Sequence, residues 1–306
     1  GHLVLAYAQH FAEANFPRAL YHANLARQHF EARFGPEPQT PAPWIWHARI
    51  IQELANVHGD LGHHAERIAL IERFNRSYQP RMVAEVAWSL MKLGRYDEAR
   101  AAARAGLAED GPGQVMVALN ALCAIEFEAG RDGASYDACG QALAHSRQTG
   151  SVTVVDLTNF AEAARTMFQL AEAERALLEA TEASSSLYGN PWLDLAELYT
   201  RAGRFAEAGQ ALSEIAAWRG KRPPHARDAD RNESRRGIAE FMLVTGMHEQ
   251  ALGLTDKAMV TPDRRAHNSR NPAQDRSLTA LLDRRARRMA ASSRRNTPGS
   301  VPSTAS

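Results

Sequence analysis

The chain has 306 residues, 44% of them hydrophobic, and 36 Lys and Arg against 35 Asp and Glu leave a net charge of +1. This apolar fraction is large enough to bury a core, which excludes wholesale disorder. Two cysteines are too few for a disulfide framework, and no run approaches the ~18 apolar residues that a membrane span needs, so we expect a soluble protein without a membrane span.

The chain predicts a series of helix pairs, each joined by a short turn. The first pair turns near Asn15–Ala19, and a loop with four prolines follows at residues 35–43. Later turn positions are separated by 32, 36, 38, 35 and 43 residues, and all but one are glycine. They are Gly62, Gly94, Gly130, Phe168, Gly203 and Gly246. Because glycine tolerates the left-handed backbone that ends a helix, each position predicts the turn of one antiparallel pair.

Small residues recur where the two helices of a pair must touch. Seven residues before the turn stand Ala55, Ala87, Cys123, Ala161, Ala196 and Ala239. Five residues after it stand Ala99, Ser135, Ala173, Ala208 and Ala251, with Arg67 as the exception. No single pair can bury its apolar face alone, so we expect neighbouring pairs to stack into a solenoid.

This order of small residue, glycine, aromatic residue and small residue resembles the tetratricopeptide repeat (TPR) family over roughly residues 1–262. The best-matching unit carries the family's pattern at Trp192, Leu195, Ala196, Tyr199, Gly203, Phe205, Ala208 and Leu212. The resemblance implies an all-α fold, an α-solenoid of stacked antiparallel helix hairpins with six to seven helix pairs in a TPR-like superhelix. The alternative is an irregular helical bundle, which the recurrent spacing argues against.

The remaining segments break or end the repeats. Residues 220–234 contain two prolines and many charges and predict an exposed loop. Residues 263–291 form a basic segment with a possible capping helix at Leu278–Ala291, and residues 292–306 predict a disordered tail. We expect the arginines at 284, 285, 287 and 288 to belong to a solvated tail or a junction to another domain. No aromatic residues interleave with them, which argues against nucleic acid as a partner.

Two clusters could carry metal or redox chemistry. His58, His63 and His64 lie near one turn, but no cysteine or carboxylate pair completes a tetrahedral set, so we expect no metal. Cys123 and Cys139 occupy facing positions on the two helices of one pair. A disulfide there would need α-carbons within about 7 Å and an oxidising compartment, and we favour two buried thiols that fill space.

Catalytic motifs are absent from the sequence. It has no phosphate-binding glycine-rich loop, no His-Glu-x-x-His, no Gly-x-Ser-x-Gly and no Cys-x-x-Cys. We therefore expect no enzyme and no cofactor. Because no charged and apolar leader follows Gly1, we expect a cytoplasmic protein, and the missing Met suggests an excised or processed piece.

In a TPR-like superhelix the first helix of each pair lines the concave groove, so we projected that face. The candidate residues for binding a peptide are Arg49, Gln52, Asn56, Trp88, Met91, Asn120, Phe127, Glu162, Arg165, Glu197, Arg201 and Glu240, and Leu193 and Arg236 fall on the same face. The N-terminal half suits an apolar anchor, whereas the glutamates of the C-terminal half suit a basic partner. An equally good interpretation pairs Glu162 with Arg165 and Glu197 with Arg201 along the helices.

These patterns favour a non-enzymatic protein-interaction scaffold that binds a peptide or helix in its groove. The alternative is a ligand-sensing or regulatory repeat segment of a larger bacterial signalling or transcription-control protein. An enzyme would require carboxylates or histidines that converge in one closed pocket. The groove lacks the lysines with which chaperone-binding members of the family hold an acidic C-terminus, and the sequence fixes neither the partner nor the oligomeric state.

Overall fold

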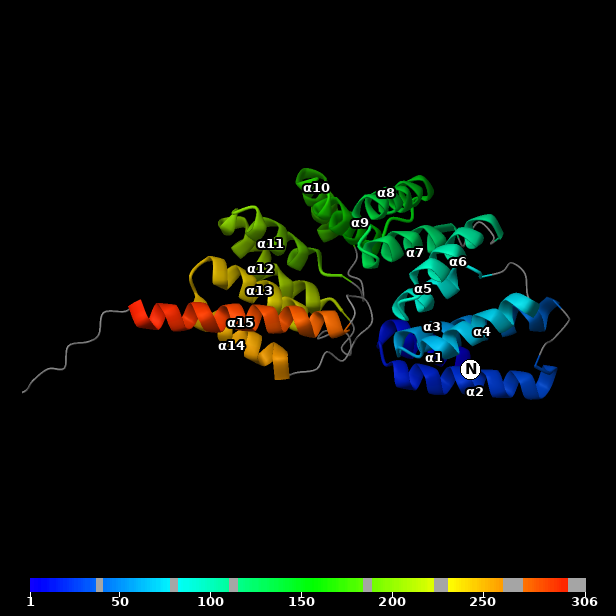
Figure 1. Cartoon of the computed structure of the whole chain (residues 1–306). Coiled ribbons are helices and arrows are strands. Elements are labelled where there is room, and N and C mark those ends of the chain that lie inside the picture. The colour runs from blue at the N-terminus through cyan, green and yellow to red at the C-terminus, as the bar shows by residue number, and fades with distance from the viewer. Residues whose placement is uncertain are drawn as a thin grey trace, which may run out of the picture.

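The computed structural model describes residues 1–36, 41–77, 82–109, 115–183, 189–222, 231–260 and 272–296. Within these ranges every regular element is a helix. Consecutive helices pack in antiparallel pairs along a curved path that rises from α1–α4 through α8–α10 and descends to α15 (Figure 1). The predicted all-α solenoid of stacked helix hairpins is therefore confirmed.

Seven pairs and a single last helix make up the described part of the chain. The first pair joins α1 (His2–Tyr7) and the short π-helix η1 (Ala8–Ala12) to α2 (Phe16–Phe34). The others are α3 (Pro41–Asp60) with α4 (His64–Ser77), α5 (Glu85–Lys92) with α6 (Tyr96–Glu109), α7 (Val115–Glu128) with α8 (Asp132–Thr149), α9 (Val154–Thr166) with α10 (Leu170–Glu182), α11 (Pro191–Arg201) with α12 (Phe205–Gly220), and α13 (Arg231–Val244) with α14 (His248–Val260). The last helix is α15 (Pro272–Asn296).

Several predicted boundaries are wrong. The loops at 35–43 and 220–234 are shorter than expected, because α3 begins at Pro41 and α13 begins at Arg231. Proline is tolerated in the first turn of a helix, where its missing N–H would have no partner. The tail predicted from residue 292 is helical as far as Asn296, and the capping helix is longer than Leu278–Ala291. Residues 37–40, 223–230, 261–271 and 297–306 lie outside the described residues.

Each helix pair turns at a residue with left-handed backbone, as the register predicts. The turn residues have φ between 58° and 84°, and they are Gly62, Gly94, Gly130, Phe168, Gly203 and Gly246. At Gly94 the N–H of Arg95 donates to the carbonyl of Leu90 at 2.9 Å, which closes the end of α5. Ala14 has the same conformation (φ 53°) at the first, more degenerate turn.

Phe168 is the only one of these six turn residues that is not glycine, so its left-handed backbone is energetically unfavourable. Its φ is 58°, its side chain is 86% exposed, and the N–H of Gln169 donates to the carbonyl of Ala164 at 2.8 Å as at the glycine turns. A residue with a Cβ loses roughly 1–2 kcal/mol in left-handed backbone. The turn at Phe168 therefore has the same left-handed backbone as the glycine turns, although its residue carries a Cβ.

We predict that Phe168→Gly raises the free energy of unfolding by about 1 kcal/mol, because the strain disappears and the exposed ring contributes little packing. Urea unfolding followed by circular dichroism measures the change. Phe168→Ala is the matched control, since it removes the ring but keeps the Cβ, and it should give no comparable gain. Equal stabilisation by both variants would mean that the exposed ring, and not the backbone, is the cause.

The small residues of the register form the contact between paired helices. The six positions before the turn are no more than 2% exposed, and the five small residues after it are fully buried. At the exceptional position, Arg67 fits because it faces Gly59, which has no side chain. A Cβ on Gly59 would lie 3.0 Å from the Cδ of Arg67. Arg67 ion-pairs with Glu85 and donates to the Glu85 carbonyl at 2.7 Å, so it joins α4 to α5 of the next pair.

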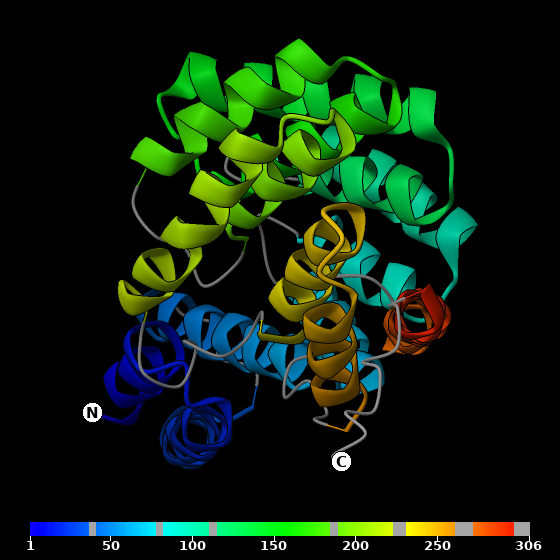
Figure 2. The same cartoon turned by 90° about the vertical axis from the view of Figure 1, so that its left-hand side faces the viewer.

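The first helices of the pairs form the inner wall of the curve. Successive first helices contact one another from α5 through α7, α9 and α11 to α13, whereas no two second helices of the described chain approach to this extent. Helix α15 contacts α13 in the same way and packs along α14, so it continues the inner wall. Figure 2, seen from the side where α15 lies, shows the helices arranged around a curved path.

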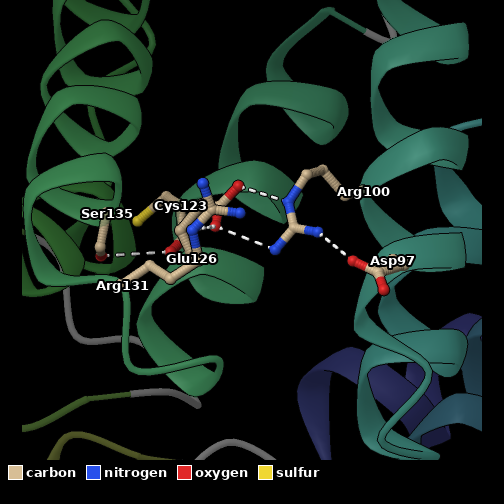
Figure 3. A network of polar contacts seen from close by, with 6 residues as sticks. All are labelled: Asp97, Arg100, Cys123, Glu126, Arg131 and Ser135. Carbon is tan, nitrogen blue, oxygen red and sulfur yellow. Dashed lines mark hydrogen bonds and ion pairs between the residues drawn. The ribbon is translucent and has the colours of Figure 1, made fainter.

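A buried ion pair joins α6 to α7 (Figure 3). Arg100 donates to both carboxylate oxygens of Glu126, at 2.7 and 3.1 Å, and to Asp97 at 2.7 Å. Arg131 approaches the same carboxylate at 3.4 Å. The hydrogen bond from Arg100 holds the pKa of Glu126 below its usual value, so the carboxylate stays ionised. The fork geometry thereby fixes how one helix pair sits on the next.

Cys123 and Cys139 form a disulfide between α7 and α8, with α-carbons 4.6 Å apart. The prediction of two free thiols is therefore wrong. The helices approach closely here because the register places small residues at their contact, and Ser135 donates to the carbonyl of Cys123 at 3.3 Å. No described helix has the length and hydropathy that a membrane span requires.

His10 lies buried in the first pair between two carboxylates of α3. Its Nδ1 lies 2.9 Å from Oε1 of Glu53 and its Nε2 lies 2.7 Å from Oδ2 of Asp60, and its exposed fraction is 1%. Burial alone would lower the pKa of His10, but the hydrogen bonds and charges of Asp60 and Glu53 outweigh it and raise the pKa to about 9. The ring is therefore protonated at neutral pH and links α3 to η1.

Because its pKa is higher in the folded state than the ordinary 6.5, His10 stabilises the fold fully below pH 6.5 and loses this effect as the pH rises through about 9. We predict that the free energy of unfolding falls by about 2–3 kcal/mol over this range. Urea unfolding at a series of pH values measures the slope. His10→Gln should be less stable at neutral pH and show a flatter profile, and parallel profiles for the two proteins would refute the assignment.

Candidate functional site

A ladder of opposite charges crosses the C-terminal half of the inner wall. Arg165 on α9 lies 3.6 Å from Glu162 on the same helix and 3.0 Å from Glu197 on α11. Arg201 on α11 lies 3.8 Å from Glu197 and 3.6 Å from Glu240 on α13. These five residues, which we call the charge ladder, pair both along and between successive inner helices.

The charge ladder shows that the predicted glutamates face arginines of the wall itself. Burial would lower the pKa of Arg165, but the charges of Glu197 and Glu162 outweigh it and raise the pKa above its usual value. Both partners of the central pair are largely enclosed, with 13% of the Arg165 side chain and 12% of the Glu197 side chain exposed. The ladder therefore helps to fix the spacing of α9, α11 and α13.

We predict that Arg165→Ala costs about 2–3 kcal/mol of unfolding free energy, because it leaves the enclosed Glu197 without its closest partner. A double-mutant cycle with Glu197→Ala should give a coupling of about 1–2 kcal/mol between the two side chains. The control cycle uses Arg147 and Glu179, an ion pair at 2.6 Å whose side chains are 54% and 45% exposed. Indistinguishable coupling in the two cycles would contradict a structural role for the ladder.

Most of the predicted groove residues in the N-terminal half are only partly exposed to solvent. Arg49 is exposed, and Gln52, Asn56, Trp88 and Phe127 are half-buried. Asn120 is also half-buried, and it donates to Asp156 on α9 at 3.0 Å, so its side chain connects two inner helices.

Two residues of the projected face are wrong as groove residues, because Met91 is 3% and Leu193 is 2% exposed. Helix α5 is only eight residues long and packs against α4, α6 and α7, which encloses the last turn that carries Met91. Leu193 is enclosed by α13, where its Cδ1 would lie 2.7 Å from a Cβ placed on Gly237. Both side chains therefore belong to the contact between inner helices.

Sequence reasoning missed two apolar side chains on α3. Ile45 is 46% exposed and Trp46 is 53% exposed. The guanidinium carbon of Arg49 lies 5.3 Å from the centroid of the Trp46 ring, which brings Trp46 to the predicted groove residue. The signal was the three-residue spacing of Trp46 and Arg49, which places both side chains on one face of the helix, but the projection began at Arg49.

A cleft of about 720 Å³ lies at the C-terminal end of the wall, between α11, α13 and α15. The charge-ladder residues Arg201 and Glu240 line one side. The other side carries Arg284, Arg285 and Arg288 of α15. These arginines were expected in a solvated tail or a domain junction, and the structure instead places them on the last inner helix.

The histidine cluster near the second turn is only partly assembled. His58 and His63 lie with their Nδ1 atoms 3.2 Å apart, while burial lowers the pKa of both His58 and His64. Low pKa values leave imidazole neutral and able to bind a metal, but a site needs further ligands. In the parts of the chain that the structure describes, no three His, Cys, Asp or Glu residues converge on a metal position.

Comparison with known proteins identifies no family. No protein-family model matches the chain, and no curated protein matches it. Among solved structures, the crystal structure of BtubC (BKLC) from P. vanneervenii aligns with 95% of this chain and 97% of that chain, at 16% identity and a TM-score of 0.40. So slight a likeness carries no argument about function.

Proposed function

We propose that this protein is a non-enzymatic interaction scaffold of TPR-like repeats, whose inner wall binds an extended or helical segment of another protein. The observation that carries the proposal is the half-exposed Trp46 beside Arg49 on α3, the first helix of the second pair. Exposed aromatic and arginine side chains dominate the affinity of protein interfaces. The stacked helices offer them on a surface that is already in place before binding.

The charges of the wall have a different part in this proposal. Because Glu162, Glu197 and Glu240 each have an arginine within 4 Å, a basic segment would have to displace an existing ion pair. The middle of the wall therefore presents little net charge to a partner. Affinity comes from Trp46 and the half-buried Trp88, and the ladder contributes to register and specificity.

We predict that peptides selected on the wall depend on Trp46. Panning a display library of fifteen-residue peptides on the immobilised chain, followed by calorimetry of synthetic winners, identifies ligands. Trp46→Ala should weaken their binding at least tenfold, roughly the 1.4 kcal/mol or more that an aromatic anchor supplies.

The matched control is Tyr21→Ala on α2, a second helix, because Tyr21 is an aromatic residue that is at least as exposed, at 62% against 53% for Trp46. This variant should bind the same peptides with unchanged affinity. Thermal melts of both variants check that each remains folded. Ligands that bind Trp46→Ala and Trp88→Ala as tightly as the unmodified chain would show that the inner wall is not the binding surface.

A further inference from the structure

Positively charged side chains outnumber negatively charged ones among the described residues that line the cleft at the end of the inner wall. Five arginines and two glutamates line it. Both glutamates, Glu197 and Glu240, lie within 4 Å of Arg201. The remaining charge lies on α15, where Arg284, Arg285 and Arg288 have no ion-pair partner among the described residues.

Packing aims these arginines into the cleft. Leu281, Arg284, Arg285 and Arg288 follow helical spacing and form one stripe, and all four line the cleft. Ala286 and Ala290 are 0% and 2% exposed, which buries another face of α15 in its contacts with α13 and α14. The orientation of the stripe is therefore set by the core and does not depend on a ligand.

Arg287 shows the difference between the two sides of α15. It lies within the same run of arginines, but it donates to Asp283 at 2.9 Å and pairs with Asp256 on α14. Arg284, Arg285 and Arg288 have no such carboxylate among the described residues. Like charges spaced three and four residues apart on a helix repel one another, so an anionic group in the cleft would relieve that repulsion.

The lining favours carboxylates on a peptide over a nucleic acid. Guanidinium groups bind carboxylates through two parallel hydrogen bonds, and Leu281 and Met289 add an apolar surface for an aliphatic side chain. A nucleic acid would in addition need aromatic side chains for base stacking, and none is among the described residues that line the cleft.

We propose that the cleft between α11, α13 and α15 binds an acidic peptide segment, with its carboxylates against Arg284, Arg285 and Arg288 and an aliphatic side chain against Leu281 and Met289. The inference rests on the proposed scaffold function and names the chemistry of the partner at this end of the wall. It differs from the sequence-based expectation of a basic partner, because the glutamates that suggested one are already paired.

The test uses the full chain and fluorescence anisotropy. The probe is a fluorescein-labelled twelve-residue peptide with four glutamates and two leucines among glycine and serine. We expect saturable binding that weakens as NaCl rises from about 50 to about 500 mM, and no binding of the same peptide with lysines in place of glutamates. Arg284→Gln combined with Arg288→Gln should weaken binding at least roughly tenfold.

Arg287→Gln is the matched control, because it removes the same charge from the same helix outside the cleft, and it should change the affinity less than about twofold. Arg284 and Arg288 are exposed and have no ion-pair partner among the described residues, so their replacement should leave the melting temperature unchanged. Arg284→Glu with Arg288→Glu supplies a second check, since this variant should bind the lysine peptide instead.

Four outcomes would overturn the proposal. They are no binding of the acidic peptide, equal loss in Arg287→Gln, equally tight binding of a twelve-nucleotide oligothymidylate, and displacement of the peptide by equimolar inorganic phosphate. If ligands selected on the wall still depend on Trp46, such a result refutes the acidic cleft alone. If the binding of those ligands is also independent of Trp46, both the acidic cleft and the proposed scaffold function are refuted.

Discussion

The structure depends on the close contact of two antiparallel helices at small residues. Alanines at 0–2% exposure let the helices of a pair approach, and they leave each pair with an apolar face that it cannot bury itself. Neighbouring pairs cover that face. One core cluster includes Leu143, Leu157, Leu177 and Leu195, which come from α8, α9, α10 and α11 and therefore from three consecutive pairs. Because each pair is completed only by the next, the first helices line up into a continuous wall.

Apolar contacts hold the pairs together, and directional ion pairs fix how they are turned relative to one another. Arg67 with Glu85 joins α4 to α5, and Arg100 with Glu126 joins α6 to α7. On the inner wall, equivalent ion pairs between successive inner helices are formed by Arg165 with Glu197 and by Arg201 with Glu240. The charge ladder ends at Glu240 on α13, because α15, the next inner helix, contains no glutamate. Arg284, Arg285 and Arg288, which have no ion-pair partner among the described residues, thus follow the last ion pair of the ladder, and this is why positive charge collects there.

The position of each residue along a repeat could be predicted from the sequence, whereas the rotation of each helix about its axis could not. The turns at Gly94 and Phe168 depend on backbone geometry within a few residues, so spacing was sufficient to find them. The burial of Met91 depends on three other helices, and the projection of a single helix cannot include them. Among the described residues no turn glycine follows α15, so the repeat offered no signal for its place in the wall.

The most direct test of stacking is a nested series of fragments that contain α11–α12 alone, α9–α12, α7–α12 and the full chain, each studied by circular dichroism and urea unfolding. If neighbouring pairs supply the missing core, residues 190–221 alone are largely unfolded, and helicity and unfolding free energy rise with every added pair. An isolated α11–α12 pair that is fully helical, with a stability that neighbours do not increase, would contradict the account.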